Sequence, residues 1–225
     1  MKVVAIIPAA GTGSRIKSTG VPKQFFEING KPLLDWTLEA VSASDIIEGI
    51  YLVVSPNDIE TVSARYSKTM FRKICGVVAG GETRAESVSL GVSAAKCEFV
   101  LIHDAARPFV TPDIISNTVN SAFIHGASTA ALPVSDTLKG KDGEFIGRPI
   151  DRESTLAIQT PQVFKREILI EAYETLDIKG NSWTDETSLV AELGKPVAWV
   201  MGSRFNVKVT TEEDLEMAVK LLGSV

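Results

Sequence analysis

Residues 3–25 read VVAIIPAAGTGSRIKSTGVPKQF, an apolar run that passes into a small, glycine-rich loop and then into a basic segment. An unbroken apolar run is typical of a strand buried on both faces, as in a parallel sheet. The loop opens with Ala9, Ala10 and Gly11, so backbone N–H groups can approach an anion closely. Arg15 adds a planar fork of donors and Lys23 a compact charge, and both suit phosphate oxygens. The stretch therefore predicts a strand that ends at an anion-binding loop.

The loop matches neither of the two familiar phosphate-binding fingerprints. The dinucleotide fingerprint requires a third glycine where Ile16 stands, and the P-loop string does not occur in the chain. A plain strand-to-helix turn with solvated cations stays open as the alternative. We interpret Lys17 as a solvated cation.

Apolar runs bounded by turn residues recur along the chain and alternate with amphipathic segments of helical length. This alternation predicts an α/β fold, a three-layer Rossmann-like and mostly parallel sheet flanked by helices, with right-handed crossovers. Thr83 and Glu86 form a capping-box pattern, and Thr111 before Pro112 marks another helix start. We expect strands at residues 3–7, 50–54, 74–79, 99–102, 127–134, 197–201 and 206–209, and helices at residues 33–41, 59–66, 83–95, 165–175, 185–193 and 211–222, with one more starting at 111.

The alternation breaks after residue 134, and residues 135–156 form a polar, turn-rich excursion from what we expect to be one domain spanning residues 1–225. Gly140, Gly143 and Gly147 punctuate it, and alternating residues around Phe145 suggest a projecting β-hairpin. Long excursions from compact domains are usually functional. We expect an arm for oligomerisation or substrate binding; a surface insertion without a role is the alternative.

Composition narrows the class of protein. The formal net charge of −5 leaves no basic excess for a nucleic-acid backbone. Two cysteines and two histidines make a zinc site improbable. The first residues start a strand rather than a signal peptide, and no apolar run reaches the ~18 residues of a membrane span. We expect a cytoplasmic protein that works without nucleic acid or membrane.

A second candidate site lies in VLIHDAARP, residues 100–108, where Asp104 follows a buried-looking strand. Ligands of open parallel sheets bind outside the carboxyl ends of the strands. Beside a phosphate-binding loop, a carboxylate there is best interpreted as a Mg²⁺ ligand, because Mg²⁺ favours one or two carboxylates plus substrate phosphates. A helix cap or turn residue is the alternative for Asp104, and we interpret His103 as structural.

Weaker signals are spread over the rest of the chain. Gly80 and Gly81 follow the third expected strand and permit a base or ribose to approach the backbone; a tight turn is the alternative. Lys208 alternates with two valines, so its side chain points away from theirs. Other polar groups at loop positions are weak individually, and they include Thr137, Arg152 and Thr184.

Together these segments resemble a known family. The strings PAAGTGSR, VPKQF, GGETRAES, HDAARPF, DTLK, TPQVF, TDETS and NVKVT are similar to those of 2-C-methyl-D-erythritol 4-phosphate cytidylyltransferases of the non-mevalonate isoprenoid pathway, in matching order over nearly the whole chain. The resemblance implies a Mg²⁺-dependent reaction of CTP with methylerythritol 4-phosphate that releases pyrophosphate. It also implies in-line attack of the substrate phosphate without a covalent enzyme intermediate, which fits the lack of a nucleophile triad.

The resemblance also implies roles for individual residues. Arg15 and Lys23 would stabilise the transition state, Arg152 and Lys208 would position the substrate phosphate, and Asp104 would bind Mg²⁺ and substrate. The family's arm forms a homodimer and lends residues across it, so the arm residues would serve the neighbouring subunit. The erythritol would be held by Arg107, Thr137 and Thr184, and the nucleotide by Pro8, Ala9, Ala10, Gly11, Gly13, Gly81, Glu82, Ser87 and Ala105.

The closest rival is ribitol-5-phosphate cytidylyltransferase, which also takes an alditol phosphate. The PAAG and DAARP strings favour the isoprenoid family. A non-catalytic nucleotide sensor would require the loss of Arg15, Lys23 or Asp104, and all three are present. Glu82 stands where relatives frequently have Asp, and the basic loop is one residue longer than in some of them.

Overall fold

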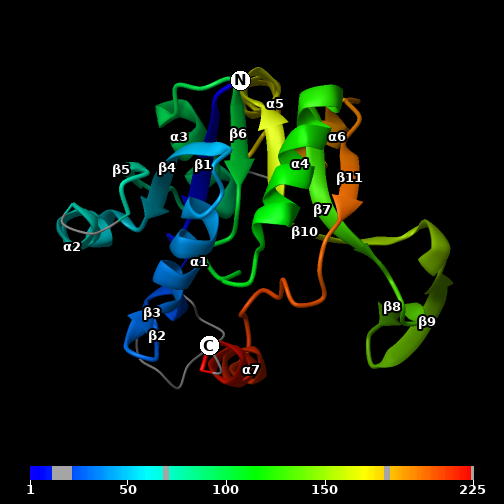
Figure 1. The fold of residues 1–225 in the computed structure, drawn as a ribbon. Coiled ribbons are helices and arrows are strands. Elements are labelled where there is room, and N and C mark those ends of the chain that lie inside the picture. The colour runs from blue at the N-terminus through cyan, green and yellow to red at the C-terminus, as the bar shows by residue number, and fades with distance from the viewer. Residues whose placement is uncertain (12–21, 68–70, 180–182, 224–225) are drawn as a thin grey trace.

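The computed structural model describes residues 1–11, 22–67, 71–179 and 183–223. Its centre is a seven-stranded sheet with the strand order β11-β7-β10-β6-β1-β4-β5 (Figure 1). Only β10 runs antiparallel to its neighbours β6 and β7. The predicted α/β fold class, with its mostly parallel sheet, is confirmed. The strands are β1 Val3–Pro8, β4 Ile47–Val54, β5 Ile74–Ala79, β6 Phe99–Ile102, β7 Ala127–Pro133, β10 Leu156–Lys165 and β11 Ala198–Met201.

Helices cover both faces of the sheet because β1 is apolar on both. Val3, Ala5 and Ile7 pack with α1, α2 and α4, whereas Val4 and Ile6 pack with α3, α5 and α6. The three predicted layers are therefore present. The helices are α1 Leu33–Ser42, α2 Ile59–Tyr66, α3 Arg84–Ala94, α4 Pro112–His125, α5 Arg166–Thr175, α6 Glu186–Glu192 and α7 Glu212–Leu222.

The order of the strands fixes where a ligand can bind. From β1 the chain proceeds outward through β4 and β5, and then returns to place β6 on the other side of β1. The connections therefore diverge from between β1 and β6, and such a switch point opens a crevice at the carboxyl ends of the strands. These ends lie in the lower half of Figure 1, toward α7 and the small hairpin of β2 Glu27–Ile28 and β3 Lys31–Pro32.

Two sequence predictions about secondary structure were wrong. Strand β10 was missed, because its middle carries Gln159, Thr160, Pro161 and Gln162 instead of an apolar run. The pairing of β10 with β7 shifts register between Ile158 and Gln162, which accommodates the proline inside the sheet. The expected strand at residues 206–209 is irregular backbone, which is held to the loop after β6 by the Val209 N–H and the Ala106 carbonyl, 2.9 Å apart.

The excursion after β7 is the predicted hairpin, built from β8 Leu138–Asp142 and β9 Phe145–Ile150. It stands away from the sheet on the right of Figure 1, and we call it the arm. Phe145 and Ile146 near its tip are 79% and 80% exposed. The arm therefore presents apolar side chains that no described part of this chain covers.

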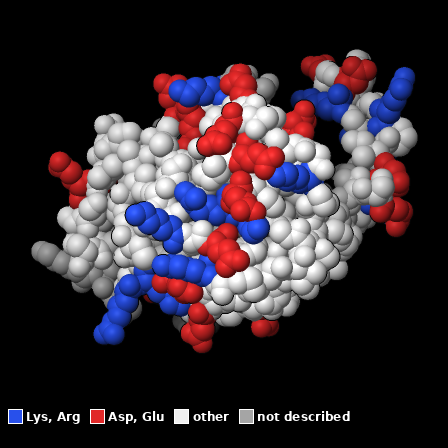
Figure 2. Space-filling view, turned by 90° about the horizontal axis from the view of Figure 1, so that it is seen from above, with Lys and Arg blue, Asp and Glu red and all other residues white. Residues whose placement is uncertain are grey.

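Figure 2 views the molecule from the side opposite the carboxyl ends of the strands. Acidic and basic side chains lie intermingled over this face, and charges of both signs also decorate the arm. Within the described residues, no helix is both long enough and apolar enough to cross a membrane.

Candidate active site

A cleft opens at the switch point, between the segments that follow β1, β5 and β6. Four parts of the chain converge on it, together with Lys208 from the irregular segment near the C-terminus. The lining residues are Pro8, Ala9, Ala10, Gly11, Lys23, Gln24, Gly81, Glu82, Thr83, Arg84, Ser87, Asp104, Ala105, Ala106 and Lys208.

The small residues let two loops meet at the floor of this cleft. A Cβ on Gly80 would lie 2.6 Å from the Ala10 Cβ and 2.8 Å from the Ser87 Oγ, so only glycine fits there. The buried Gln24 amide donates to the carbonyls of Ala9 and Gly11, at 2.8 and 3.0 Å. The described start of the loop after β1 therefore packs against Gly80 and is hydrogen-bonded by Gln24.

Helix α3 begins at the edge of the cleft with the predicted capping box. The Thr83 Oγ1 accepts from the Glu86 N–H at 3.1 Å, and the Glu86 carboxylate accepts from the Thr83 N–H at 3.1 Å. The Ser87 hydroxyl accepts from the Gly81 N–H at 3.1 Å. These bonds fix the Gly81 backbone and leave the side chain of Arg84, the first helical residue, facing the cleft.

Asp104 is the electrostatic centre of the cleft. Its carboxylate belongs to a residue that is 7% exposed, and it lies near three cations: Lys208 Nζ at 2.9 Å, Arg107 Nε at 3.4 Å and Arg84 Nε at 3.5 Å. Burial alone would raise the pKa of Asp104, but Arg84, Lys208 and Arg107 together hold it well below its usual range. Asp104 is therefore ionised near neutral pH, and the three cations around it outweigh its negative charge.

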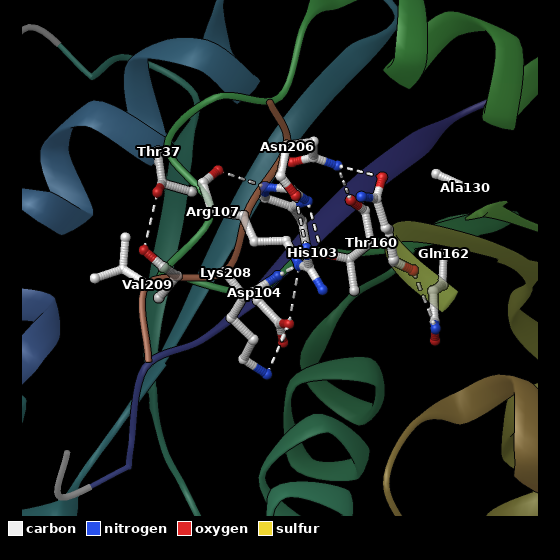
Figure 3. A network of polar contacts seen from close by, with 12 residues as sticks. Thr37, His103, Asp104, Arg107, Ala130, Thr160, Gln162, Asn206, Lys208 and Val209 are labelled. Carbon is white, nitrogen blue, oxygen red and sulfur yellow. Dashed lines mark hydrogen bonds and ion pairs between the residues drawn. The ribbon is translucent and has the colours of Figure 1, made fainter. Parts of the chain in front are cut away.

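A closed set of hydrogen bonds supports Asp104 from behind (Figure 3). The Thr160 hydroxyl accepts from the Asp104 N–H at 3.1 Å and lies 3.0 Å from His103 Nδ1. His103 Nε2 lies 3.0 Å from the Arg107 carbonyl, and Arg107 Nη1 donates to the Asn206 carbonyl at 2.7 Å. The Asn206 amide donates back to the Thr160 carbonyl at 2.8 Å. The residues on both sides of Asp104 are thus tied to the segment that carries Lys208.

His103 is neutral in this arrangement. It is fully buried, and burial lowers its pKa to about 4 despite the opposing effect of the Arg107 carbonyl. A neutral ring can donate from Nε2 to that carbonyl and accept at Nδ1 from the Thr160 hydroxyl. The interpretation of His103 as a structural residue agrees with these contacts.

Arg84 connects Asp104 to a second buried carboxylate. Its Nη1 lies 2.9 Å from each carboxylate oxygen of Glu186, which is completely buried at the start of α6. Burial would lower the pKa of Arg84, but Glu186 and Asp104 raise it.

Tyr173 is a further buried group. Burial raises the pKa of its hydroxyl, which has no hydrogen-bond partner among the described residues.

Eleven of the predicted site residues line this one cleft, and Arg107 contacts Asp104 beside it. Arg152 lies outside the cleft at the base of the arm, where it contacts Glu153 and the Ser135 carbonyl. Thr137 and Thr184 are exposed and do not line the cleft. Gly13 and Arg15 lie outside the described residues. The eleven cleft residues are Pro8, Ala9, Ala10, Gly11, Lys23, Gly81, Glu82, Ser87, Asp104, Ala105 and Lys208.

The sequence analysis assigned no role to Gln24, Arg84 or Glu186. Arg84 had a usable signal, because it follows two glycines at a strand end and begins a capped helix. No sequence spacing indicated a role for Glu186, because its partner Arg84 lies 102 positions away.

Two acidic residues of the described part of the chain line the cleft, the buried Asp104 and the exposed Glu82. Among the described residues, no group of three or more His, Cys, Asp or Glu side chains could hold a metal ion. Asp104 faces the space between Lys208 and Arg84, where an anionic ligand would gather. This donor set fits a cation that takes most of its ligands from phosphate oxygens and water.

An open, mostly parallel sheet with a small-residue loop, clustered cations and a buried carboxylate at its switch point is an arrangement that suits a nucleotidyltransferase. The family model for 2-C-methyl-D-erythritol 4-phosphate cytidylyltransferase matches residues 3–224, and the chain belongs to that family.

Relatives and solved structures agree with this assignment. A 2-C-methyl-D-erythritol 4-phosphate cytidylyltransferase from Geobacillus thermodenitrificans is 40% identical over 100% of this chain and 98% of its own length. One from Syntrophus aciditrophicus is 43% identical over 98% of this chain and 96% of its own. The crystal structure of the Thermus thermophilus enzyme superposes with a TM-score of 0.78 at 35% identity, over 100% of both chains. That of 4-diphosphocytidyl-2C-methyl-D-erythritol synthase from Anaerococcus prevotii gives 0.84 at 30% identity, over 99% of this chain and 96% of its own.

Proposed function

We propose that this chain joins CTP and 2-C-methyl-D-erythritol 4-phosphate to give 4-diphosphocytidyl-2-C-methyl-D-erythritol and pyrophosphate. A phosphate oxygen of the methylerythritol phosphate attacks the α-phosphorus of CTP, and the bond from that phosphorus to the bridging α–β oxygen breaks. Pyrophosphate carries away the electron pair of this bond, so no oxidant and no covalent enzyme intermediate are required. The family assignment supports the activity, and the cleft supports its mechanism.

Each side of the cleft suits one part of this reaction. The backbone of Ala9, Ala10 and Gly81 borders a space free of large side chains, which suits the cytidine and its triphosphate. Lys23 is held at the mouth of the loop by donation to the Val209 carbonyl at 3.0 Å, where it can stabilise charge that develops on the α-phosphate. Lys208 reaches Asp104 from the other side and suits the incoming substrate phosphate.

Mg²⁺ is part of this proposal. When bound with the triphosphate, it supplies charge neutralisation on the phosphate oxygens, and Asp104 is the residue of the cleft that would hold it. Asp104 and Arg107 would also bind the hydroxyl groups of the erythritol, since both are oriented by buried hydrogen bonds.

The convergence of Lys23, Arg84, Lys208 and Asp104 on one cleft at the switch point carries the functional proposal. A pyrophosphate-release assay with CTP and Mg²⁺ tests it. Methylerythritol 4-phosphate and ribitol 5-phosphate are supplied as acceptors in separate reactions. We expect release with the methylerythritol phosphate and little with the ribitol phosphate. If pyrophosphate is released only with ribitol phosphate, the chain is a ribitol-5-phosphate cytidylyltransferase instead. If no polyol phosphate gives release, the proposal is wrong.

The arm leads us to propose a homodimer. Phe145, Ile146 and Ile150 are exposed along it, and two-stranded hairpins are marginally stable in water without a surface to pack on. Thr137 and Arg152 lie at its base, away from the cleft of their own chain. In the proposed dimer they complete the cleft of the partner. Because the reaction consumes CTP, we expect it to take place in the cytoplasm.

A further inference from the structure

The carboxylate of Glu186 lies behind the cleft and not in it. It belongs to the first residue of α6, and no part of it is exposed. Both of its oxygens lie 2.9 Å from Arg84 Nη1, and its backbone N–H donates to the Gln162 side-chain carbonyl at 3.3 Å. Glu186 is thus fixed by its own backbone, and among the described residues Arg84 is the cleft-lining side chain that its carboxylate contacts.

Arg84 lies between two carboxylates with different surroundings. One edge of its guanidinium faces Glu186, and its Nε lies 3.5 Å from Asp104 Oδ1 on the cleft side. Lys208 and Arg107 both approach the other oxygen of Asp104, Oδ2, at 2.9 and 3.4 Å. The two oxygens of Asp104 are therefore held separately, and Arg84 is the cation that holds Oδ1.

A gain in folding stability does not explain why Arg84 and Glu186 form a buried ion pair. Removing an arginine and a glutamate from water costs much of what their attraction returns, and apolar residues of similar volume often stabilise a core equally well. The pair instead has a consequence for charge at the cleft. With Glu186 present, Arg84 is balanced from behind; without it, three cations would act on Asp104 alone.

We propose that Glu186 is a positioning residue of the cytidylyl transfer, which acts by fixing and balancing Arg84 so that Asp104 keeps its orientation toward substrate. The inference rests on the proposed function. It assigns a task to a residue that touches neither substrate nor the reacting atoms.

The isosteric substitution Glu186→Gln removes the charge and keeps the shape. We expect kcat with methylerythritol phosphate to fall about 10- to 100-fold, the range typical of residues that orient a binding-site ligand. The KM for CTP should change by less than about threefold, because Ala9, Ala10 and Gly81 are untouched. Wild-type kcat in folded Glu186→Gln protein would overturn the inference. If the variant does not fold, Glu186→Asp is measured instead. It keeps the charge but withdraws the carboxylate from Arg84 by one CH₂ group, so we expect a smaller fall in kcat, and an unchanged kcat would overturn the claim that Glu186 fixes Arg84.

A double-mutant cycle separates positioning from a structural effect. In an Arg84→Gln background, Glu186→Gln should lower kcat by less than about twofold, because Glu186 acts only through Arg84. An equal loss in both backgrounds would refute the route through Arg84. Asp35→Asn is the matched control: Asp35 is a buried carboxylate paired with Arg65 at 2.8 Å, and it does not line the cleft. We expect it to lower the urea midpoint while kcat stays at the wild-type value.

The wild-type protein is assayed first, with CTP and methylerythritol phosphate. No turnover in the wild type would defeat the proposed function, whereas wild-type turnover that Glu186→Gln does not reduce would defeat only the positioning role.

Discussion

The cleft and the arm of this protein are built in opposite ways. In the cleft, Asp104 is 7% exposed and is held by the nearby Arg107 and by Arg84 and Lys208, which come from two other segments of the sequence. In the arm, β8 pairs only with β9, and the apolar side chains near the tip face solvent. The fold of one chain therefore determines the geometry of the cleft, whereas the arm lacks a core of its own, and the proposed dimer would give it a surface to pack on.

The largest effect should come from the cleft. Lys23→Ala removes the cation that, in the proposed mechanism, meets charge developing only in the transition state, so we expect kcat to fall about 10²- to 10³-fold while the KM for CTP changes little. Steady-state kinetics with both substrates measures this. Lys96→Ala, which removes an exposed lysine outside the cleft, serves as the control. Turnover close to that of the control would contradict the role of Lys23.

The burial of His103 should make stability depend on pH. Burial lowers the pKa of His103 to about 4, whereas an unfolded histidine titrates near about 6.5. Between these values the unfolded state binds the proton more readily, so stability is lost as pH falls from about 6.5 toward 4, by up to about 3 kcal/mol. Urea unfolding at several pH values measures this loss. A His103→Gln variant with the same loss over that range would show that His103 is not its source.

The arm is tested by Arg152→Ala. If Arg152 contacts the substrate phosphate in the partner's cleft, the loss of a charged hydrogen bond worth about 1.5–3 kcal/mol should lower kcat/KM for methylerythritol phosphate about 10- to 100-fold. The affinity for CTP should be unchanged. Unaltered kcat and KM for the methylerythritol phosphate would remove Arg152 from the site and leave the arm a purely structural element.

The smallest effect concerns the packing beneath the cleft. Gly80→Ala places a Cβ against Ala10 and Ser87, so we expect a loss of about 1–3 kcal/mol in the free energy of unfolding. Gly11→Ala is the matched control, because a Cβ there meets nothing within 4 Å and stability should hardly change. Equal urea midpoints for the two variants would mean that the two loops tolerate separation.

The sequence predicted the layers of the fold well, for a physical reason. Residues 3–7 and 99–102 are unbroken apolar runs, and the strands that they form are buried on both faces. The run at residues 74–79 forms β5, which lies at the edge of the sheet and is only partly buried. Strand β10 escaped prediction because two glutamines and a threonine in it hydrogen-bond inside the core, which a pattern of apolar residues cannot register. The segment around Asn206 alternates like a strand, but it pairs with a loop and so stays irregular.

The site was only partly predictable. Ala9, Gly81 and Asp104 each follow a strand, and the carboxyl ends of parallel strands meet at one edge, so their convergence follows from topology. The pair of Arg84 and Glu186 depends on how α3 and α6 pack on the same face of the sheet, and no local signal reports that.

Subunit complementation tests the central claim most directly, namely that a complete site combines the cleft of one chain with the arm of another. Lys23→Ala and Arg152→Ala proteins, each nearly inactive, are unfolded together, refolded and assayed with CTP and methylerythritol phosphate. If the site is shared, each mixed dimer contains one cleft with both wild-type residues, and random mixing should restore about a quarter of wild-type activity. If the mixture stays as inactive as its components while native mass spectrometry shows mixed dimers, Lys23 and Arg152 serve the same chain and the claim is contradicted.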